Sequence, residues 1–306
     1  CTGRSSDENG YAIGACYFES KTYLGYFAAN KCYTHNGSYF VPAGLTDTNH
    51  RCSGQWSGNF LNWATMTAID EFRWVMTGGN RVQDTAGVSG TPGITVLQRA
   101  NMTLGTGHGW FPIKKIGTAA NGINPSTVTP YSDDPLYITS SGYAIDAGND
   151  VTTLSNLADD LPVSVQVCKP DISGLTQSQS LEANCVQYAE GTYKPEGLIQ
   201  ENATSMRFAL MSYLRDNSQE RDGGVLRANM KYVGPTRFLA SGVAEANPNK
   251  EWDSTTGVQL AITDPDFLAG GAPSNSSAVG GGSVDTEIGY SGVINYINKF
   301  GANGYK

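Results

Sequence analysis

Cysteines are the residues of this sequence with the clearest chemistry. Six of them stand at positions 1, 16, 32, 52, 168 and 185, none in a CxxC pair, and the chain has only three histidines. Zinc and thiol-redox sites need closely spaced Cys or His ligands, so this pattern favours disulfides made in an oxidising compartment. Cys168 and Cys185 are the expected pair, because they stand apart from the other four and close a short local loop. The pairing stays open among the first four, which are Cys1, Cys16, Cys32 and Cys52.

Carboxylates around a Gly/Ser-rich stretch are the candidate ligands for a metal ion. Asp264, Asp266 and Asp285 flank residues 269–283, and Asp253 lies further upstream. Calcium prefers hard oxygen ligands, so these side chains are weak calcium candidates. The sequence has no EF-hand loop, and acidic residues that cap turns explain most such clusters. Calcium is therefore the one cofactor that the sequence suggests, with turn capping as the favoured alternative.

A catalytic constellation is not recognisable. His108 lies among glycines, and a Ser-His triad would also need a nucleophile on a strained Gly-x-Ser-x-Gly turn. The nearest approach, around Ser89, does not complete this motif, because Thr91 stands where the second glycine would be. We therefore expect a non-enzymatic protein with His108 as a loop residue, and a secreted hydrolase is the least favoured function.

Three tryptophans raise the question of ligand stacking, since aromatic side chains anchor carbohydrates and protein partners. The seven-residue spacing from Trp56 to Trp63 nearly repeats one face of a helix, and Trp74 follows in the same segment. Core packing is therefore the favoured interpretation of Trp56, Trp63 and Trp74.

Composition favours an exported protein without a nucleic-acid partner. Charged residues make up 16% of the chain, the formal net charge is −8 and the isoelectric point is near 4.9. Nucleic-acid binders need a basic face, which this balance disfavours. A membrane-spanning helix needs about 20 apolar residues, and we find no such stretch.

Two segments have a helical pattern. The stronger covers residues 59–76, where apolar side chains that include Phe72 and Val75 recur at helical spacing. The other covers residues 291–300, with Ser291 as the N-cap and a glycine as the stop. These two segments are the helices that the sequence predicts.

Strands are expected in several short β-rich runs. Residues 94–97 and 162–167 are the clearest, and residues 206–214 favour a strand that ends in a loop. Asn36-Gly37 between aromatic residues is typical of a hairpin turn.

Changes of composition along the chain suggest its organisation. Residues 1–56 are expected to form a cystine-pinned loop region, and residues 57–306 a domain that contains an insertion at about 80–165. The Gly/Ser-rich residues 269–283 are expected to form a flexible loop.

Ordered sequence runs resemble the N-terminal half of the PilC/PilY family of type IV pilus tip-associated proteins. The most specific run is WSGNFLNWATMT at residues 56–67. It is followed in order by GGNR at 78–81, VQVC at 165–168, LEANC at 181–185, YKPEGL at 193–198, MRFAL at 206–210 and GGVLR at 223–227.

The resemblance implies an α/β fold, namely a von Willebrand factor A-like doubly wound sheet that is disulfide-bonded and heavily interrupted by strand-and-loop insertions. In that fold the helix at 59–76 would flank the sheet and residues 206–214 would form a central strand. The Asp-x-Ser-x-Ser metal motif of such domains and the family's C-terminal calcium-binding propeller do not occur in this sequence.

The resemblance also implies a function and a location. It predicts an extracellular, cell-surface adhesin module at the pilus tip, exported through the periplasm of a Gram-negative bacterium, that supports pilus assembly, retraction control and surface attachment. The implied partners are pilin or minor pilins and a host or abiotic surface. The alternative function is a structural subunit of an extracellular filament, and in either case we expect the chain to be cut from a longer parent.

Overall fold

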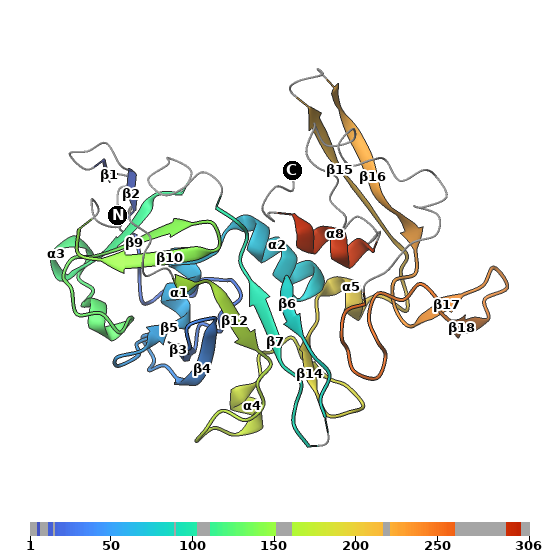
Figure 1. Cartoon of the computed structure of the whole chain (residues 1–306), viewed down its shortest axis with the longest axis horizontal. Helices are drawn as coiled ribbons and strands as arrows, with labels where there is room; N and C mark the ends of the chain where they lie inside the picture. Colours follow the sequence, from blue (N-terminus) through green and yellow to red (C-terminus); the bar gives the residue numbers. More distant parts are fainter. Residues whose placement is uncertain are drawn as a thin grey trace.

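The computed structural model describes residues 5–6, 12–14, 16–88, 90–102, 111–150, 161–216, 221–260 and 292–300. Within them, two six-stranded sheets pack around one large core, and a smaller group of helices and a β-ribbon lies beside it (Figure 1). None of the described helices has the length and hydropathy needed to cross a bilayer.

One sheet combines strands from distant parts of the chain. Its order is β5 (Trp56–Ser57), β3 (Lys31–His35), β4 (Phe40–Leu45), β12 (Ser164–Val167), β7 (Thr95–Gln98) and β6 (Arg81–Asp84). Neighbouring strands are antiparallel except for β4 and β12, which are parallel. The β3–β4 hairpin turns where the sequence predicts, because Asn36 Oδ1 accepts hydrogen bonds from the backbone N–H groups of Ser38 and Tyr39.

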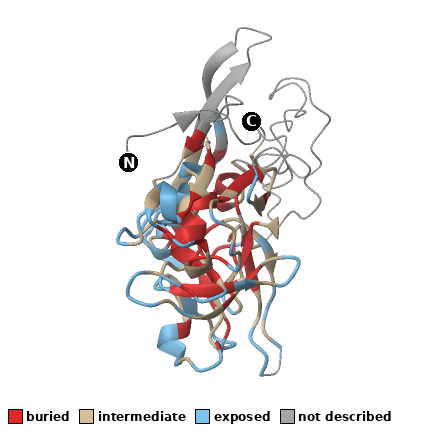
Figure 2. Cartoon of the chain, turned by 90° about the vertical axis from the view of Figure 1, so that its left-hand side faces the viewer, coloured by how far each residue is buried: buried red, intermediate tan, exposed pale blue. Residues whose placement is uncertain are grey.

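The other sheet is also mostly antiparallel. Its order is β1 (Ser5–Ser6), β2 (Ala12–Gly14), β8 (Ile113–Ile116), β9 (Leu136–Ser141), β10 (Ala144–Gly148) and β11 (Leu161–Pro162). Phe40 and Val165 of the first sheet and Ile138 of the second belong to one cluster of buried side chains. Figure 2 shows buried residues concentrated in the interior, with exposed loops at the rim.

The described topology confirms a mixed α/β, disulfide-bonded protein. A doubly wound sheet is mainly parallel, whereas only β4–β12 and β2–β8 are parallel here. The von Willebrand factor A-like topology is therefore not confirmed. Residues 80–165, which were expected to form an insertion, supply strands to both sheets. Residue 56 was the expected boundary of the cystine-pinned region, and the first sheet contains strands from both sides of it.

The single helix expected at residues 59–76 is wrong, because the segment forms two helices. Helix α1 (Gly58–Thr65) ends where Met66 takes an extended conformation, and α2 (Ala68–Thr77) begins after Thr67. The Asp70 carboxylate accepts hydrogen bonds from the backbone N–H and the hydroxyl of Thr67. This capping interaction starts a new helix after the extended backbone of residues 66–67.

Helix α2 buries a polar face rather than the apolar face that its spacing predicts. Phe72 and Val75 are each 43% exposed, whereas Asp70 and Arg73 are fully buried. Asp70 Oδ1 also accepts a hydrogen bond from the backbone N–H of Ala100 at 2.6 Å. The orientation of α2 therefore does not follow its hydrophobic periodicity, and Asp70 meets hydrogen-bonding partners on the inward face.

The segment expected to form a central strand is a strand, but it is not central. Strand β15 (Phe208–Asp216) pairs with β16 (Arg221–Lys231), and among the described residues these two form a separate two-stranded ribbon that projects from the body (Figure 1). The prediction that residues 206–214 form a central strand is therefore wrong. The base of the ribbon packs with Ile199 and Ile294 in a second, smaller core.

The helix expected near the end of the chain is present as α8 (Val293–Lys299). Its N-cap is Gly292, and the expected cap, Ser291, lies outside the described residues. The buried Glu251 carboxylate accepts hydrogen bonds from the backbone N–H groups of Val293 and Ile294 at 2.7 and 2.8 Å. A carboxylate distant in sequence therefore caps this helix.

Short elements complete the structure. They are α3 (Thr118–Asn121), a 3-10 turn (Pro125–Thr127), α4 (Gln177–Ser180), β13 (Cys185–Gln187), β14 (Tyr193–Pro195), α5 (Leu198–Glu201), β17 (Thr236–Phe238) and β18 (Ala244–Ala246).

Candidate binding groove

A groove with a volume of about 440 Å³ lies between two loop segments that are far apart in the sequence. Residues 22–31 line one wall, Ser178 and residues 181–184 line the other, and Asn62 of α1 and Trp74 of α2 complete the lining. Its volume falls in the range of about 300–1,000 Å³ that is typical of small-ligand sites. We call this feature the groove.

Two buried asparagines of α1 hold the first wall in place. Asn62 Nδ2 donates to the carbonyl oxygens of Tyr23 and Phe27, and its Oδ1 accepts from the Phe27 N–H. One turn earlier, Asn59 Oδ1 accepts from the Tyr23 N–H and its Nδ2 donates to Lys21 O, each at 2.8 Å. The two amides thus replace the hydrogen bonds that a strand or helix would provide.

A glycine allows this wall to approach α1 closely. A Cβ atom at Gly25 would collide with the Asn62 side chain and with Met66. Any larger residue would therefore push the segment away from the asparagine that holds it.

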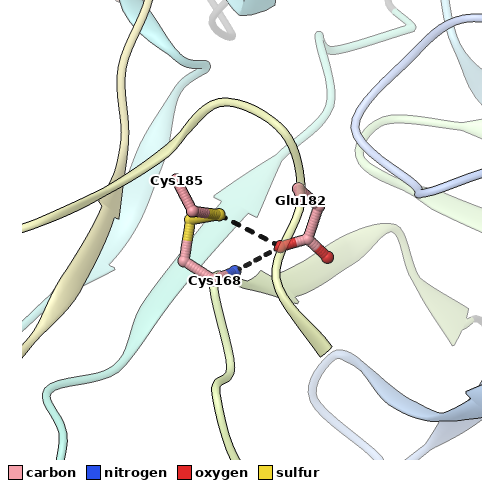
Figure 3. Close-up of side chains that lie close together, drawn as sticks. All are labelled: Cys168, Glu182 and Cys185. Carbon is pink, nitrogen blue, oxygen red and sulfur yellow. Dashed lines mark hydrogen bonds between the residues drawn. A yellow bond between two sulfur atoms is a disulfide. The ribbon is translucent and has the colours of Figure 1, made fainter. Parts of the chain in front are cut away.

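The second wall is fixed by an ion pair and a disulfide. Lys31, 1% exposed, lies 2.6 Å from Glu182 Oε1 and also donates to the backbone oxygen of Ser180. Glu182 Oε2 accepts a hydrogen bond of 2.7 Å from the backbone N–H of Cys168. Cys168 is bonded to Cys185, as the sequence predicts, and Figure 3 shows Glu182 reaching both cysteines. One carboxylate therefore connects β3, the end of β12 and the loop before β13.

The group formed by Cys168, Glu182 and Cys185 is close enough in space to suggest metal ligands. However, the two sulfurs form a disulfide, and metal binding by cysteine requires the thiolate. For the same reason the 3.3 Å approach of Cys185 Sγ to Glu182 is a contact and not a donated hydrogen bond. We interpret the group as a structural link.

The remaining cysteines that the structure describes are also bonded. Cys32 is bonded to Cys52, which selects one of the pairings left open by the sequence, and Cys16 is in a disulfide as well. Cys1 lies outside the described residues.

The three tryptophans have different positions. Trp56 is 2% exposed and Trp63 is partly buried, and both pack with the main core as expected. Trp74 is also partly buried against the core, but it lines the groove in addition. The stacking alternative therefore stays open for Trp74.

Most of the remaining predicted site residues lie outside the part of the chain that the structure describes. His108 and the calcium candidates Asp264, Asp266 and Asp285 lie outside the described residues, as does the loop 269–283. Asp253 caps a turn, because its Oδ1 accepts from the backbone N–H groups of Thr255 and Thr256.

A second buried ion network connects strand β6 of the first sheet to strand β14 and to Gln259. Asp84 contacts the fully buried Lys194 at 2.6 Å and Arg81 at 2.9 Å, and it accepts from the Gln259 N–H. Burial by itself would raise the pKa of Asp84, but the charges of Arg81 and Lys194 outweigh it and lower that pKa. The network is a structural connection, since these partners satisfy both carboxylate oxygens.

Sequence reasoning missed the scaffolding role of Asn59 and Asn62. Both lie in the run at residues 56–67, where two asparagines one helical turn apart are unusual for a helix interior. Asparagine is tolerated inside a helix when its side chain has hydrogen-bonding partners outside the helix. The two asparagines were therefore the signal in the sequence for a scaffolding role.

Fold and site together define a disulfide-bonded α/β protein with a neutral, ligand-sized groove. Residues 15–166 match the family model described as "PilY1 homolog, small alpha/beta domain". This match covers most of the two sheets, and the chain belongs to the PilY1 family.

Two curated relatives come from Xylella fastidiosa strain Temecula1, and both are named type IV pilus biogenesis factor PilY1 homolog. One is 33% identical over 314 residues, which is 93% of this chain and 24% of that protein. The other is 26% identical over 251 residues, which is 68% of this chain and 16% of that protein. The chain thus spans about a quarter or less of the relatives it matches. No solved structure gave a match.

Proposed function

We propose that this chain is a cell-surface module of a type IV pilus tip adhesin, which supports pilus assembly, retraction control and surface attachment. The observation that carries the proposal is the 33% identity over 93% of the chain to a protein named as a type IV pilus biogenesis factor. Its partners would be pilin or minor pilins and a host or abiotic surface.

Other features of the chain support an extracellular, non-enzymatic role. Two described disulfides fit an oxidising compartment, and export through the periplasm of a Gram-negative bacterium would provide one. The described charged side chains of the groove, Lys31 and Glu182, are paired with each other, so neither is free to act on a ligand as a general acid or base. We therefore propose binding and mechanical connection as the work of this module.

The test is an in-frame deletion of this segment from its parent gene in the native bacterium. We expect fewer surface pili by electron microscopy and weaker attachment, while a parent carrying Val88→Ala, an exposed position, should behave as wild type. Normal piliation and attachment after the deletion would overturn the proposal. Immunogold labelling along the whole filament, instead of at its tip, would favour the structural-subunit alternative.

A further inference from the structure

We propose that the groove binds a neutral saccharide, with Trp74 packing against a sugar ring and Asn30 and Asn184 hydrogen-bonding its hydroxyl groups. This inference rests on the proposed attachment function and names the ligand chemistry of the same module.

The charges of the groove disfavour an ionic ligand. Among the described residues that line it, Lys31 and Glu182 alone are charged, and they are paired with each other at 2.6 Å. Each also makes a further contact within the protein, because Lys31 donates to Ser180 O and Glu182 accepts from the Cys168 N–H. A charged ligand would lose its hydration without gaining a counterion, whereas a neutral ligand has no such cost.

The groove also has neutral hydrogen-bonding groups that the described protein does not use. Within the described residues, the Asn30 side chain has no hydrogen-bond partner, and neither do the backbone N–H groups of Leu24 and Gly25. Asn184 donates through Nδ2 to Glu196 O, which leaves its Oδ1 as an acceptor. Sugar hydroxyls both donate and accept, so they match a mixture of amide donors and acceptors.

An apolar surface accompanies these groups. Trp74 is partly buried and lines the groove, Leu24 is 58% exposed, and Leu181 lies on the opposite wall. Ligand sites typically combine such apolar walls with a few placed polar groups. The C–H face of a sugar ring suits an aromatic side chain, and its hydroxyl rim suits the asparagines.

An extended peptide is the other neutral ligand to consider, and the geometry favours it less. Peptides that bind through main-chain hydrogen bonds usually add a strand to an exposed sheet edge. Residues 22–30 contain no strand, because β3 begins at Lys31, so this wall has no ladder of alternating donors and acceptors to extend.

The test uses the full chain and a panel of neutral oligosaccharides, namely lactose, maltotriose, cellotriose and chitotriose, with sialyllactose as a charged comparison. Binding is measured by saturation-transfer NMR and by calorimetric titration. Loss of the aromatic contact in Trp74→Ala should weaken the binding of the preferred sugar by roughly threefold to tenfold. Val88→Ala, a change at an exposed apolar residue that does not line the groove, should leave the affinity unchanged.

Asn30→Ala keeps the test decisive if Trp74→Ala fails to fold. Asn30 is exposed and its side chain has no described partner, so we expect a native circular dichroism spectrum together with about threefold or greater loss of sugar affinity. No binding of any neutral sugar, equal binding by the groove variants, or a preference for sialyllactose or for a peptide would each overturn the inference.

Cell experiments separate this inference from the proposed function. A parent protein carrying Asn30→Ala should keep normal piliation and lose attachment to a surface coated with the preferred sugar. If the deletion reduces piliation but no neutral sugar binds, the saccharide inference fails and the pilus function stands.

Discussion

The hydrogen bonds of Asn62 allow a quantitative test of how the groove is built. Asn62→Ala removes one acceptor and two donors that meet the main chain of Tyr23 and Phe27 at buried and partly buried positions. Each lost bond leaves a buried backbone group without its partner, at about 1–1.5 kcal/mol per bond. The sum over the three bonds predicts a decrease of about 3–4.5 kcal/mol in the free energy of unfolding.

Asn62→Asp separates hydrogen bonding from side-chain volume. The carboxylate has nearly the same shape and can still accept from the Phe27 N–H, but it has no N–H to donate to the two carbonyl oxygens. It also places a charge at a position that is 3% exposed. We therefore expect Asn62→Asp to be at least as destabilising as Asn62→Ala.

The assay is urea unfolding followed by tryptophan fluorescence and far-UV circular dichroism. Asn202→Ala is the matched control, because it removes one local hydrogen bond, to Leu198 O, in an exposed position. The control should lose less than about 1 kcal/mol. A loss of the same small size for Asn62→Ala, or a fully stable Asn62→Asp, would refute the view that this side chain holds the groove wall.

Three further predictions concern stability. Burial raises the pKa of the Glu251 carboxyl to about 7 from an ordinary 4.5, so the folded protein holds this proton more tightly than the unfolded chain does. The resulting contribution of Glu251 to stability is full below about pH 4.5 and is lost as the pH rises through 7. Glu251→Gln should flatten that decline in melting temperature, and an unchanged profile would contradict the assignment. Replacing both Cys168 and Cys185 by serine removes the disulfide that closes a loop with a sequence separation of 17. Thermal or urea unfolding should show that the free energy of unfolding falls by about 3 kcal/mol. Equal stability of this variant and the wild-type protein would argue against that contribution. Lys194→Met leaves the buried Asp84 without its closest cation and should cost about 3–5 kcal/mol, part of which the double variant Lys194→Met/Asp84→Asn should recover. Additive losses in that double-mutant cycle would show that the pair is not coupled.

Local patterns in the sequence predicted several elements correctly. The Asn36-Gly37 turn, the strand at residues 206–214 and the helix near residue 293 all depend on neighbours within a few positions. The start of α2 was equally local, since Thr67 and Asp70 have the spacing of a capping interaction, and the apolar periodicity obscured it.

The sequence by itself determined the family and the mixed α/β class, together with the pairing of Cys168 and Cys185. Only the tertiary structure decided that β15 lies in a separate ribbon and that α2 buries its polar face, because strand partners and helix orientation depend on contacts between distant residues. The groove is the clearest example of a feature that only the tertiary structure decides. Its two walls are joined by Lys31 and Glu182, which are 151 positions apart, and no local pattern can specify a contact across that distance.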